Sequence, residues 1–261
     1  MFEAIGALLV SGLAWAGDVS LFGLRAIREA LRPPYEFREF IRQEYEIGWR
    51  SAPLIAVAGF AVGVVMSMHS RSSLQRFGAE AMIPTVLALT LAREIGPLVA
   101  GLLVSGRVGA GIGAELGGMR VTEQIDALES LAVDSFKYLV VTRVVACVIA
   151  QPILTTLMTF TGIIGGYVSE TVISGVSLRL YFDRAFSSME FADYVPSSLK
   201  TMVFGFIIGT VSCYLGYNTK GAAEGVGRAS TRSVVLTSIL LIVTNVILVK
   251  IIIFLFPQQT G

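Results

Sequence analysis

The sequence predicts an all-α membrane protein: an N-terminal interfacial amphipathic helix, five transmembrane helices and a short helix on the cytoplasmic side. Hydrophobic residues make up 54% of the 261 residues and charged residues only 15%, compared with about 25% in soluble domains. The mean hydropathy is +0.73. Five apolar stretches each reach the roughly 20 residues that cross the hydrocarbon layer as a helix. This length and composition predict one membrane domain.

Residues 1–48 are expected to lie at the membrane surface. Within residues 1–31, bulky apolar residues alternate with small ones, and arginines gather at the end of the stretch. Gly6, Gly12, Gly17 and Asp18 interrupt the stretch, which favours an interfacial amphipathic helix over a full span. A pair of prolines then ends this helix. Residues 35–50 carry aromatic residues and charges of both signs, as suits a short helix at the level of the headgroups.

Residues 49–261 are expected to form a single transmembrane domain. The segment between the third and fourth spans, residues 168–194, is polar enough to hold short surface helices. The five spans are predicted at about Trp49–Met68, Met82–Ser105, Tyr138–Tyr167, Val195–Tyr217 and Ser233–Phe256.

Arginine and lysine residues predict which side of the membrane each segment faces. If the N-terminus is cytoplasmic, the segments on that side hold twelve of these residues, against five on the opposite side. Because positive residues collect on the cytoplasmic side, we expect a cytoplasmic N-terminus. Five spans then put the C-terminus on the outer side of the membrane, and residues 106–137 form a cytoplasmic loop.

Small residues recur at a spacing of four from the second span into this loop. On a helix, this spacing makes one small-residue face that lets another backbone approach closely. Two interpretations stay open: a tight, sliding contact at the centre of an assembly, or static packing within the subunit. The residues are Gly101, Ser105, Gly109, Gly113 and Gly117.

A short acidic and apolar helix is predicted at about residues 122–132. Thr122 is the expected N-cap, and an acidic residue in the first turn suits the helix dipole. Such a helix would fit a groove in a cytoplasmic partner. The alternative is a solvated connector whose apolar side rests on the headgroups. The acidic side holds Glu123, Asp126 and Glu129, and the apolar side holds Ile125, Leu128 and Ala132.

Charged residues within the predicted spans are candidates for a binding site. Arg93 and Glu94 lie in the middle of the second span, where an ionised group costs about 2.5–3.5 kcal/mol. Lys200 lies near the outer end of the fourth span, and Lys250 in the fifth can reach the interface. A cavity for a lipid headgroup would use cations for the phosphate and a carboxylate to orient them. The alternative is an internal ion pair that holds the helices in register.

Several classes of chemistry are not expected. The chain has no GxxxxGK[ST] nucleotide motif, so energy from ATP would have to come from another subunit. His69 is the only histidine and has no cluster of ligands around it, so we expect no metal site and no catalytic residues. Nothing indicates nucleic-acid binding. Cys147 and Cys213 fall in apolar stretches and are expected to be buried without a disulfide.

Three segments carry a resemblance to a known family. They are ALTLAREIGPLVAGLLVSGRVGAGIGAELGGMRVTEQIDALESLAVD at 88–134, LKTMVFGFIIG at 199–209 and GVGRASTRSVVLTSI at 225–239. The chain resembles the MlaE/YrbE permeases, which are membrane subunits of ABC transporters that work with MCE-domain proteins. The resemblance extends over nearly the whole chain and is far more specific than a short motif.

The resemblance implies a homodimer in which each copy binds one cytoplasmic ABC ATPase subunit. That ATPase would bind ATP and Mg²⁺, and this chain would need no cofactor. Charged positions near the family's lipid pocket match Arg93, Glu94 and Lys200, and a periplasmic MCE-domain protein would cover the pocket. The family's coupling helix, which docks in the ATPase, is similar to the segment that holds Glu123, Gln124, Ile125, Asp126, Leu128 and Glu129.

Two positions depart from the family pattern. Ser135 follows Asp134 where the family often has proline, which predicts a looser turn after the coupling helix. Asn245 stands where the family has an acidic residue in the last span, which puts in doubt a mechanism that needs a charge there.

The resemblance therefore implies a transport subunit, not an enzyme, that moves phospholipids between the inner membrane and an MCE-domain partner. Closure of the ATPase would push on residues 122–132, shift the glycine-faced helix at the dimer contact and collapse the lipid pocket. One alternative is an ABC permease for another substrate, such as a sterol or a small solute. The other is a non-transporting membrane scaffold for envelope proteins.

Overall fold

The computed structural model describes residues 2–187, 189 and 191–255. These residues form helices joined by short turns, and no strand occurs among them. Five helical segments in this part of the chain are long and apolar enough to cross a membrane, so the prediction of an all-α membrane protein is confirmed. The segments are Phe37–Phe77, Glu80–Val121, Phe136–Ser174, Tyr194–Tyr217 and Ala223–Leu255.

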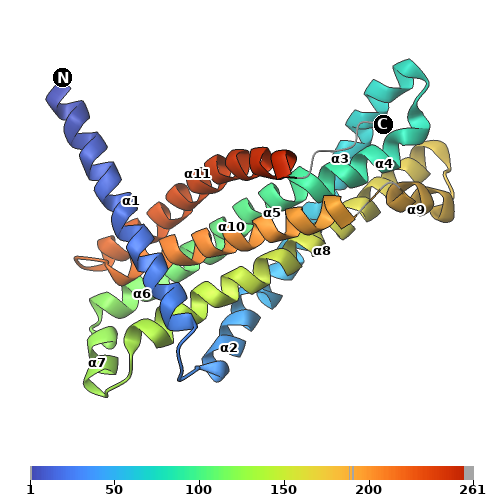
Figure 1. The fold of residues 1–261 in the computed structure, drawn as a ribbon. Helices are drawn as coiled ribbons and strands as arrows, with labels where there is room; N and C mark the ends of the chain where they lie inside the picture. The colour runs from blue at the N-terminus through green and yellow to red at the C-terminus, as the bar shows by residue number, and fades with distance from the viewer. Residues whose placement is uncertain (1, 188, 190, 256–261) are drawn as a thin grey trace.

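Two helices lie at the start of the described chain. The long helix α1 (Phe2–Ala30) projects from one end of the bundle, and α2 (Phe37–Ile47) lies beside α8 (Figure 1). Aromatic contacts hold α1 to the bundle. The ring of Phe22 meets Phe136 edge-on, with centroids 5.0 Å apart, and Tyr214 edge-on at 5.5 Å. Such aromatic pairs contribute beyond their buried area, so the second half of α1 is firmly placed against the ends of two spans.

The second span is one long helix that is widened twice. The prediction of a loop beginning at residue 106 is wrong, because the helix continues to Val121. Ile112 and Leu116, on the extended part, are buried in the core, and this burial stabilises the extra turns. The run comprises α4 (Ile83–Thr90), α5 (Gly96–Val104) and α6 (Ala110–Val121), joined by π turns at Leu91–Ile95 and Ser105–Gly109.

Glycines allow close packing around the central helix. A Cβ on Gly63 would overlap the carbonyl oxygen of Gly162, and a Cβ on Gly205 would overlap that of Cys147. Helices in a membrane associate closely where small residues meet, so α8 is held on both sides by backbone contact. The three helices concerned are α3 (Ala52–Leu74), α8 (Thr142–Ser174) and α10 (Phe191–Tyr217).

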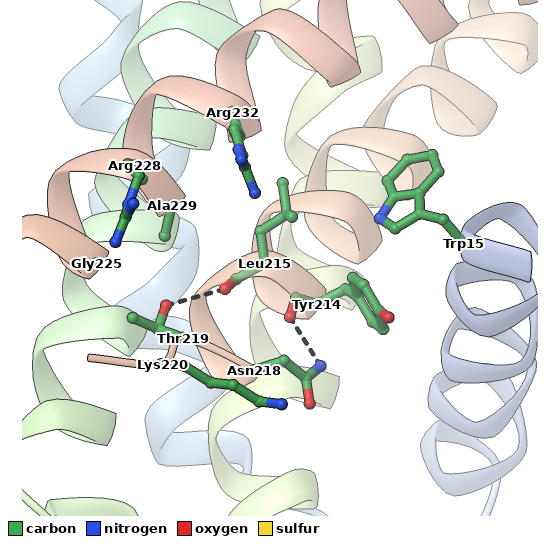
Figure 2. A pocket seen from close by; sticks show the side chains of 10 residues that line it. All are labelled: Trp15, Tyr214, Leu215, Asn218, Thr219, Lys220, Gly225, Arg228, Ala229 and Arg232. Carbon is green, nitrogen blue, oxygen red and sulfur yellow. Dashed lines mark hydrogen bonds between the residues drawn. The ribbon is translucent and has the colours of Figure 1, made fainter. Parts of the chain in front are cut away.

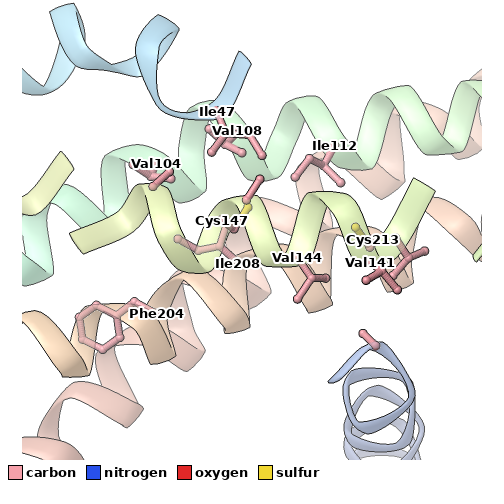
Figure 3. Packing of buried hydrophobic residues seen from close by; sticks show 14 of the residues in the cluster. Ile47, Val104, Val108, Ile112, Val141, Val144, Cys147, Phe204, Ile208 and Cys213 are labelled. Atoms are coloured by element: carbon pink, nitrogen blue, oxygen red, sulfur yellow. The ribbon is translucent and has the colours of Figure 1, made fainter. Parts of the chain in front are cut away.

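Apolar side chains from α5, α6, α8 and α10 form the largest buried core (Figure 3). Val104 from α5, Cys147 from α8, and Phe204 and Ile208 from α10 each have an exposed fraction of 2% or less. Cys147 and Cys213 are free thiols in this core, as the sequence predicts. Their environment is apolar, so they act as small hydrophobic residues.

Two further helices, α9 (Leu178–Ser187) and α11 (Ala223–Leu255), lie on the outside of the bundle. The segment between the third and fourth spans contains α9, as expected for a surface helix, and buried Tyr181 attaches it to α4. The last helix, α11, packs along α6 and α10 on one side only. Its other side exposes large apolar residues, including Val235, Ile239, Ile242, Val246 and Ile247.

We expect Gly63→Ala to destabilise the bundle. The added Cβ meets a backbone oxygen that no rotamer change can remove, and overpacking of this kind costs about 1–3 kcal/mol. Thermal unfolding in detergent measures the effect. Gly227→Ala in α11 is the matched control, because open space surrounds that position and alanine favours a helix over glycine. Equal melting temperatures for the two variants would contradict this account of the α3–α8 contact.

Candidate functional site

The charged residues predicted within the spans are brought together by the fold. Arg93 and Glu94 lie in the π turn Leu91–Ile95 of the second span, and Lys200 lies in α10. The Lys200 ammonium donates a hydrogen bond to the carbonyl oxygen of Arg93 at 2.6 Å and lies 3.1 Å from a carboxylate oxygen of Glu94. Two residues more than a hundred positions apart therefore share one intramembrane ion pair.

A proline explains why a backbone oxygen takes part in this cluster. In an α-helix, the carbonyl of residue 93 pairs with the N–H of residue 97, but Pro97 has no N–H. The Arg93 carbonyl oxygen instead accepts hydrogen bonds from two side chains of α10, Lys200 at 2.6 Å and Ser197 at 3.2 Å. The π turn before the proline widens the helix, and such turns often mark functional positions.

The two members of the ion pair differ in their access to the surface. The Lys200 side chain is 1% exposed, whereas the Glu94 side chain is 43% exposed. The amide nitrogen of Asn245, on α11, lies 3.5 Å from the same Glu94 oxygen. Glu94 therefore links the buried lysine to the outside of the subunit, between the second span and α11. Arg93 is half-buried in the same π turn.

This arrangement can bind a charged group that reaches Glu94 from the surface. An ionised side chain within a membrane is costly, so it is paired or lines a substrate pathway. Here the Lys200 ammonium faces the Glu94 carboxylate, and Arg93 takes part through its carbonyl oxygen. A phosphate group would compete with Glu94 for the Lys200 ammonium. The lysine would then exchange its charge-assisted hydrogen bond with the carboxylate for one with the phosphate. The site thus has the donors that an anionic or zwitterionic headgroup requires.

The small-residue face packs within the subunit. Gly101, Ser105, Gly109, Gly113 and Gly117 all face α10 or α11 of the same chain. A Cβ on Gly113 would lie 2.5 Å from the Ser233 hydroxyl oxygen, and one on Gly109 would lie 3.1 Å from that of Ser212. Of the two interpretations that the sequence left open, packing within the subunit accounts for these contacts, because α10 and α11 already occupy the face.

The helix expected at residues 122–132 is shorter and begins later. The observed helix α7 spans Gln124–Ser130. Thr122 is not its N-cap: the Thr122 hydroxyl donates to the carbonyl oxygen of Gly118, and Glu123 occupies the cap position with a positive φ of 59°. The last turn of α6 therefore competes successfully for the threonine hydroxyl, and the left-handed residue turns the chain sharply into α7.

Side chains on both faces attach α7 to the spans. Ile125 is fully buried, and Leu128 packs against the main core. Asp126 pairs with Arg120 of α6 at 2.7 Å. Gln124 and Glu123 are exposed on the outer side. Ile125 and Leu128 therefore anchor α7, whereas Glu123, Gln124, Asp126 and Glu129 are exposed to a partner.

Glu129 connects α7 to the end of α10. A Glu129 carboxylate oxygen accepts hydrogen bonds from the Ser135 hydroxyl at 2.6 Å and from the Tyr217 hydroxyl at 3.3 Å. Ser135 and Tyr217 lie 2.8 Å apart. The Ser135 hydroxyl therefore makes two polar contacts in the turn after α7, where the sequence predicted a looser turn. Tyr217 and Lys200 lie on the same helix, roughly 25 Å apart at 1.5 Å per residue.

A second buried ion pair was not predicted from the sequence. Arg71, at the end of α3, lies 2.5 Å from Glu170 of α8, which also accepts a hydrogen bond from Ser67 at 2.8 Å. Glu80 lies 3.6 Å from the same arginine. Burial, and then the charge of Glu170, raises the pKa of Tyr181 on α9. Because Arg71 falls outside the predicted first span, Trp49–Met68, the sequence did not place it opposite Glu170 of the third span.

Metal binding has no support among the residues that the structure describes, since no three histidine, cysteine, aspartate or glutamate side chains in that part gather as ligands.

The fold and this site define an α-helical integral membrane protein with a charged site inside its membrane-spanning bundle. The chain belongs to the MlaE permease family, because the family model described as Permease MlaE matches residues 40–251. It is therefore a transport permease subunit by family. The charged cluster, α7 and nearly all of the five spans lie within the matched region.

Individual relatives agree with this assignment. The chain is 43% identical over 234 residues to a probable ABC transporter permease protein of Rickettsia bellii, covering 90% of each chain. It is 32% identical to the chloroplastic protein TRIGALACTOSYLDIACYLGLYCEROL 1 of Arabidopsis thaliana, covering 90% of this chain and 67% of that one. It is 31% identical to the intermembrane phospholipid transport system permease protein MlaE of Haemophilus influenzae, covering 88% of each.

Proposed function

We propose that this chain is the membrane subunit of an ATP-driven transporter that moves phospholipids between an inner membrane and a periplasmic MCE-domain partner. The observation that carries the proposal is the cluster of Lys200, Glu94 and the Arg93 carbonyl, buried in the bundle and reached from the surface through Glu94. The name of the Haemophilus influenzae relative, a phospholipid transport permease, supports a phospholipid as the substrate.

The proposed assembly is a homodimer with one ATPase on each copy. The small-residue face is filled within the subunit, so the dimer contact is expected on the apolar surface that α11 exposes. Glu94 and Asn245 border that surface, and a second copy there would enclose the charged site between two subunits. The N-terminus and α7 face the cytoplasm in this proposal, the C-terminus faces the periplasm, and ATP and Mg²⁺ bind to the ATPase.

The proposed mechanism connects α7 to the charged site through α10. A cytoplasmic ATPase would contact the outward side of α7, and Glu129 would pass a displacement of α7 to Tyr217 at the end of α10. Movement of α10 would change the distance between Lys200 and Glu94. The access of a headgroup phosphate to the lysine would change with it. ATP-driven closure would thus favour release of the lipid, and reopening would restore the ion pair.

Native mass spectrometry of the tagged complex in mild detergent tests the assembly and the substrate class together. We expect two copies of this chain, two ATPase subunits and copurified phospholipid. Copurified sterol in place of phospholipid would favour the alternative of a sterol permease. A lone chain without ATPase or lipid would contradict the transport proposal and favour a membrane scaffold.

A further inference from the structure

A basic pocket lies at the end of the bundle that carries α7, away from the charged cluster in the spans. Its volume is about 500 Å³, within the usual range of ligand sites. Figure 2 shows that it is bounded by Trp15 of α1 on one side and by α11 on the other, with the turn after α10 as its floor. It is lined by Trp15, Tyr214, Leu215, Asn218, Thr219, Lys220, Gly225, Arg228, Ala229 and Arg232.

Basic residues predominate in the lining of this pocket, and on the α1 side Asp18 makes an acidic contact with the lining residue Tyr214. Of the ten described residues that line it, three are basic and none is acidic. Arg228 has an acidic neighbour on its own helix, since Glu224 lies 3.4 Å away, but both side chains are largely exposed. Among the described residues, no acidic group lies within ion-pair distance of Lys220 or Arg232. The pocket therefore presents an excess of positive charge to an incoming ligand.

Helix geometry adds to this preference for an anion. The helix α11 begins at Ala223, so the N–H groups of its first turn and the positive end of its dipole lie beside the pocket residue Gly225. Arginine side chains bind phosphate oxygens with two parallel hydrogen bonds, and lysine adds a compact charge. Lys220, Arg228 and Arg232 together supply the donor set of a phosphate site.

An aromatic wall indicates that the phosphate belongs to a lipid. The Trp15 ring meets the Tyr214 ring edge-on, with centroids 6.5 Å apart. The same stretch of α1 exposes Leu13 and Leu21, which is typical of a helix that lies in the membrane interface. Tryptophan is enriched at the membrane–water interface, where its ring lies at the level of the headgroups. A free anion would need the basic side chains but not this apolar wall.

We propose that this pocket binds the headgroup of an anionic phospholipid, which would hold α1 against the α10–α11 turn. This site goes beyond the transport function proposed above and does not depend on it, because it shares no residue with the cluster around Lys200. Basic pockets between membrane helices at the cytoplasmic side are known to bind anionic headgroups.

Fluorescence of Trp15 provides a local test on the full-length protein in detergent. The chain has two tryptophans, so Trp49→Phe leaves Trp15 as the only reporter. Short-chain phosphatidylglycerol should shift its emission saturably, whereas phosphatidylcholine of the same chain length should act only at much higher concentration. Replacing Lys220, Arg228 and Arg232 by glutamine should weaken the phosphatidylglycerol response about tenfold or more.

Controls separate this proposal from its alternatives. Arg179→Gln is the matched control, because Arg179 is an exposed arginine with an acidic neighbour at i+4, on α9, and it should leave the response unchanged. Arg232→Gln alone should weaken the response in part, which keeps the test valid if the triple variant does not fold. Inorganic phosphate that reproduces the shift would indicate a free-anion site. An equal response to both lipids, or one that survives the triple change, would overturn the proposal.

Discussion

Replacing Lys200 by methionine is expected to reduce ATP-driven phospholipid transfer in proteoliposomes by about tenfold or more, since truncating one partner of a buried charge pair costs about 2–5 kcal/mol. Methionine keeps the length of the side chain but removes the ammonium that holds Glu94 and the Arg93 carbonyl. The Glu94 carboxylate that is left unpaired is half-exposed. The variant should therefore lose stability at the lower end of this range of about 2–5 kcal/mol. Transfer is measured with labelled phospholipid in the presence of the ATPase.

A double variant distinguishes a site from a structural ion pair. In Glu94→Gln with Lys200→Met, no unpaired charge remains, so the melting temperature should recover toward that of the parent protein. Transfer should stay low, because the cation that binds the headgroup is still absent. Recovery of both properties would show that the pair only holds α10 in register. Lys250→Met is the control, since Lys250 is an exposed lysine in α11, outside the cluster.

Reversing the charge at Glu123 is expected to separate ATP hydrolysis from lipid transfer. Glu123 is exposed beside α7 and makes no contribution to the anchors at Ile125 and Glu129, so Glu123→Arg should fold normally. A like-charge contact with a partner that recognises an acidic residue costs several kcal/mol. We therefore expect transfer per ATP hydrolysed to fall about tenfold, which parallel assays of phosphate release and lipid transfer measure.

The choice of substitutions makes this test specific. Arginine tolerates the positive φ of Glu123 no better and no worse than glutamate does, so the backbone of the turn is not the variable. Asp183→Arg is the control. Asp183 lies on α9, far from α7, and its side chain is 70% exposed. If Glu123→Arg leaves transfer fully coupled, α7 is a connector and not the docking element.

The positions of helices could largely be predicted from the sequence, and their ends could not. Five apolar stretches of sufficient length predict five spans, because the hydrocarbon layer sets a minimum length for each. The second span was predicted to end at Ser105, but its helix continues through Gly109, Gly113 and Gly117. They remain helical because α10 and α11 pack against them, and such tertiary contacts override local propensity.

The candidate site was predictable as a set of residues but not as an arrangement. Arg93, Glu94 and Lys200 are conspicuous because charges are rare within membrane spans. Their relationship depends on the placement of α10 against the π turn, which no local pattern specifies. The role of Pro97, which leaves the Arg93 carbonyl to side-chain donors of α10, follows only when both helices are seen together.

The sequence by itself determined the membrane class, the number of spans, the family and the charged residues of the site, because each rests on composition or on patterns along one segment. Only the tertiary structure decided that Lys200 pairs with Glu94, that Ser135 and Tyr217 attach Glu129 of α7 to α10, and that α1 and α11 enclose a basic pocket. Each of these joins residues distant in the chain, and their contact depends on how whole helices pack.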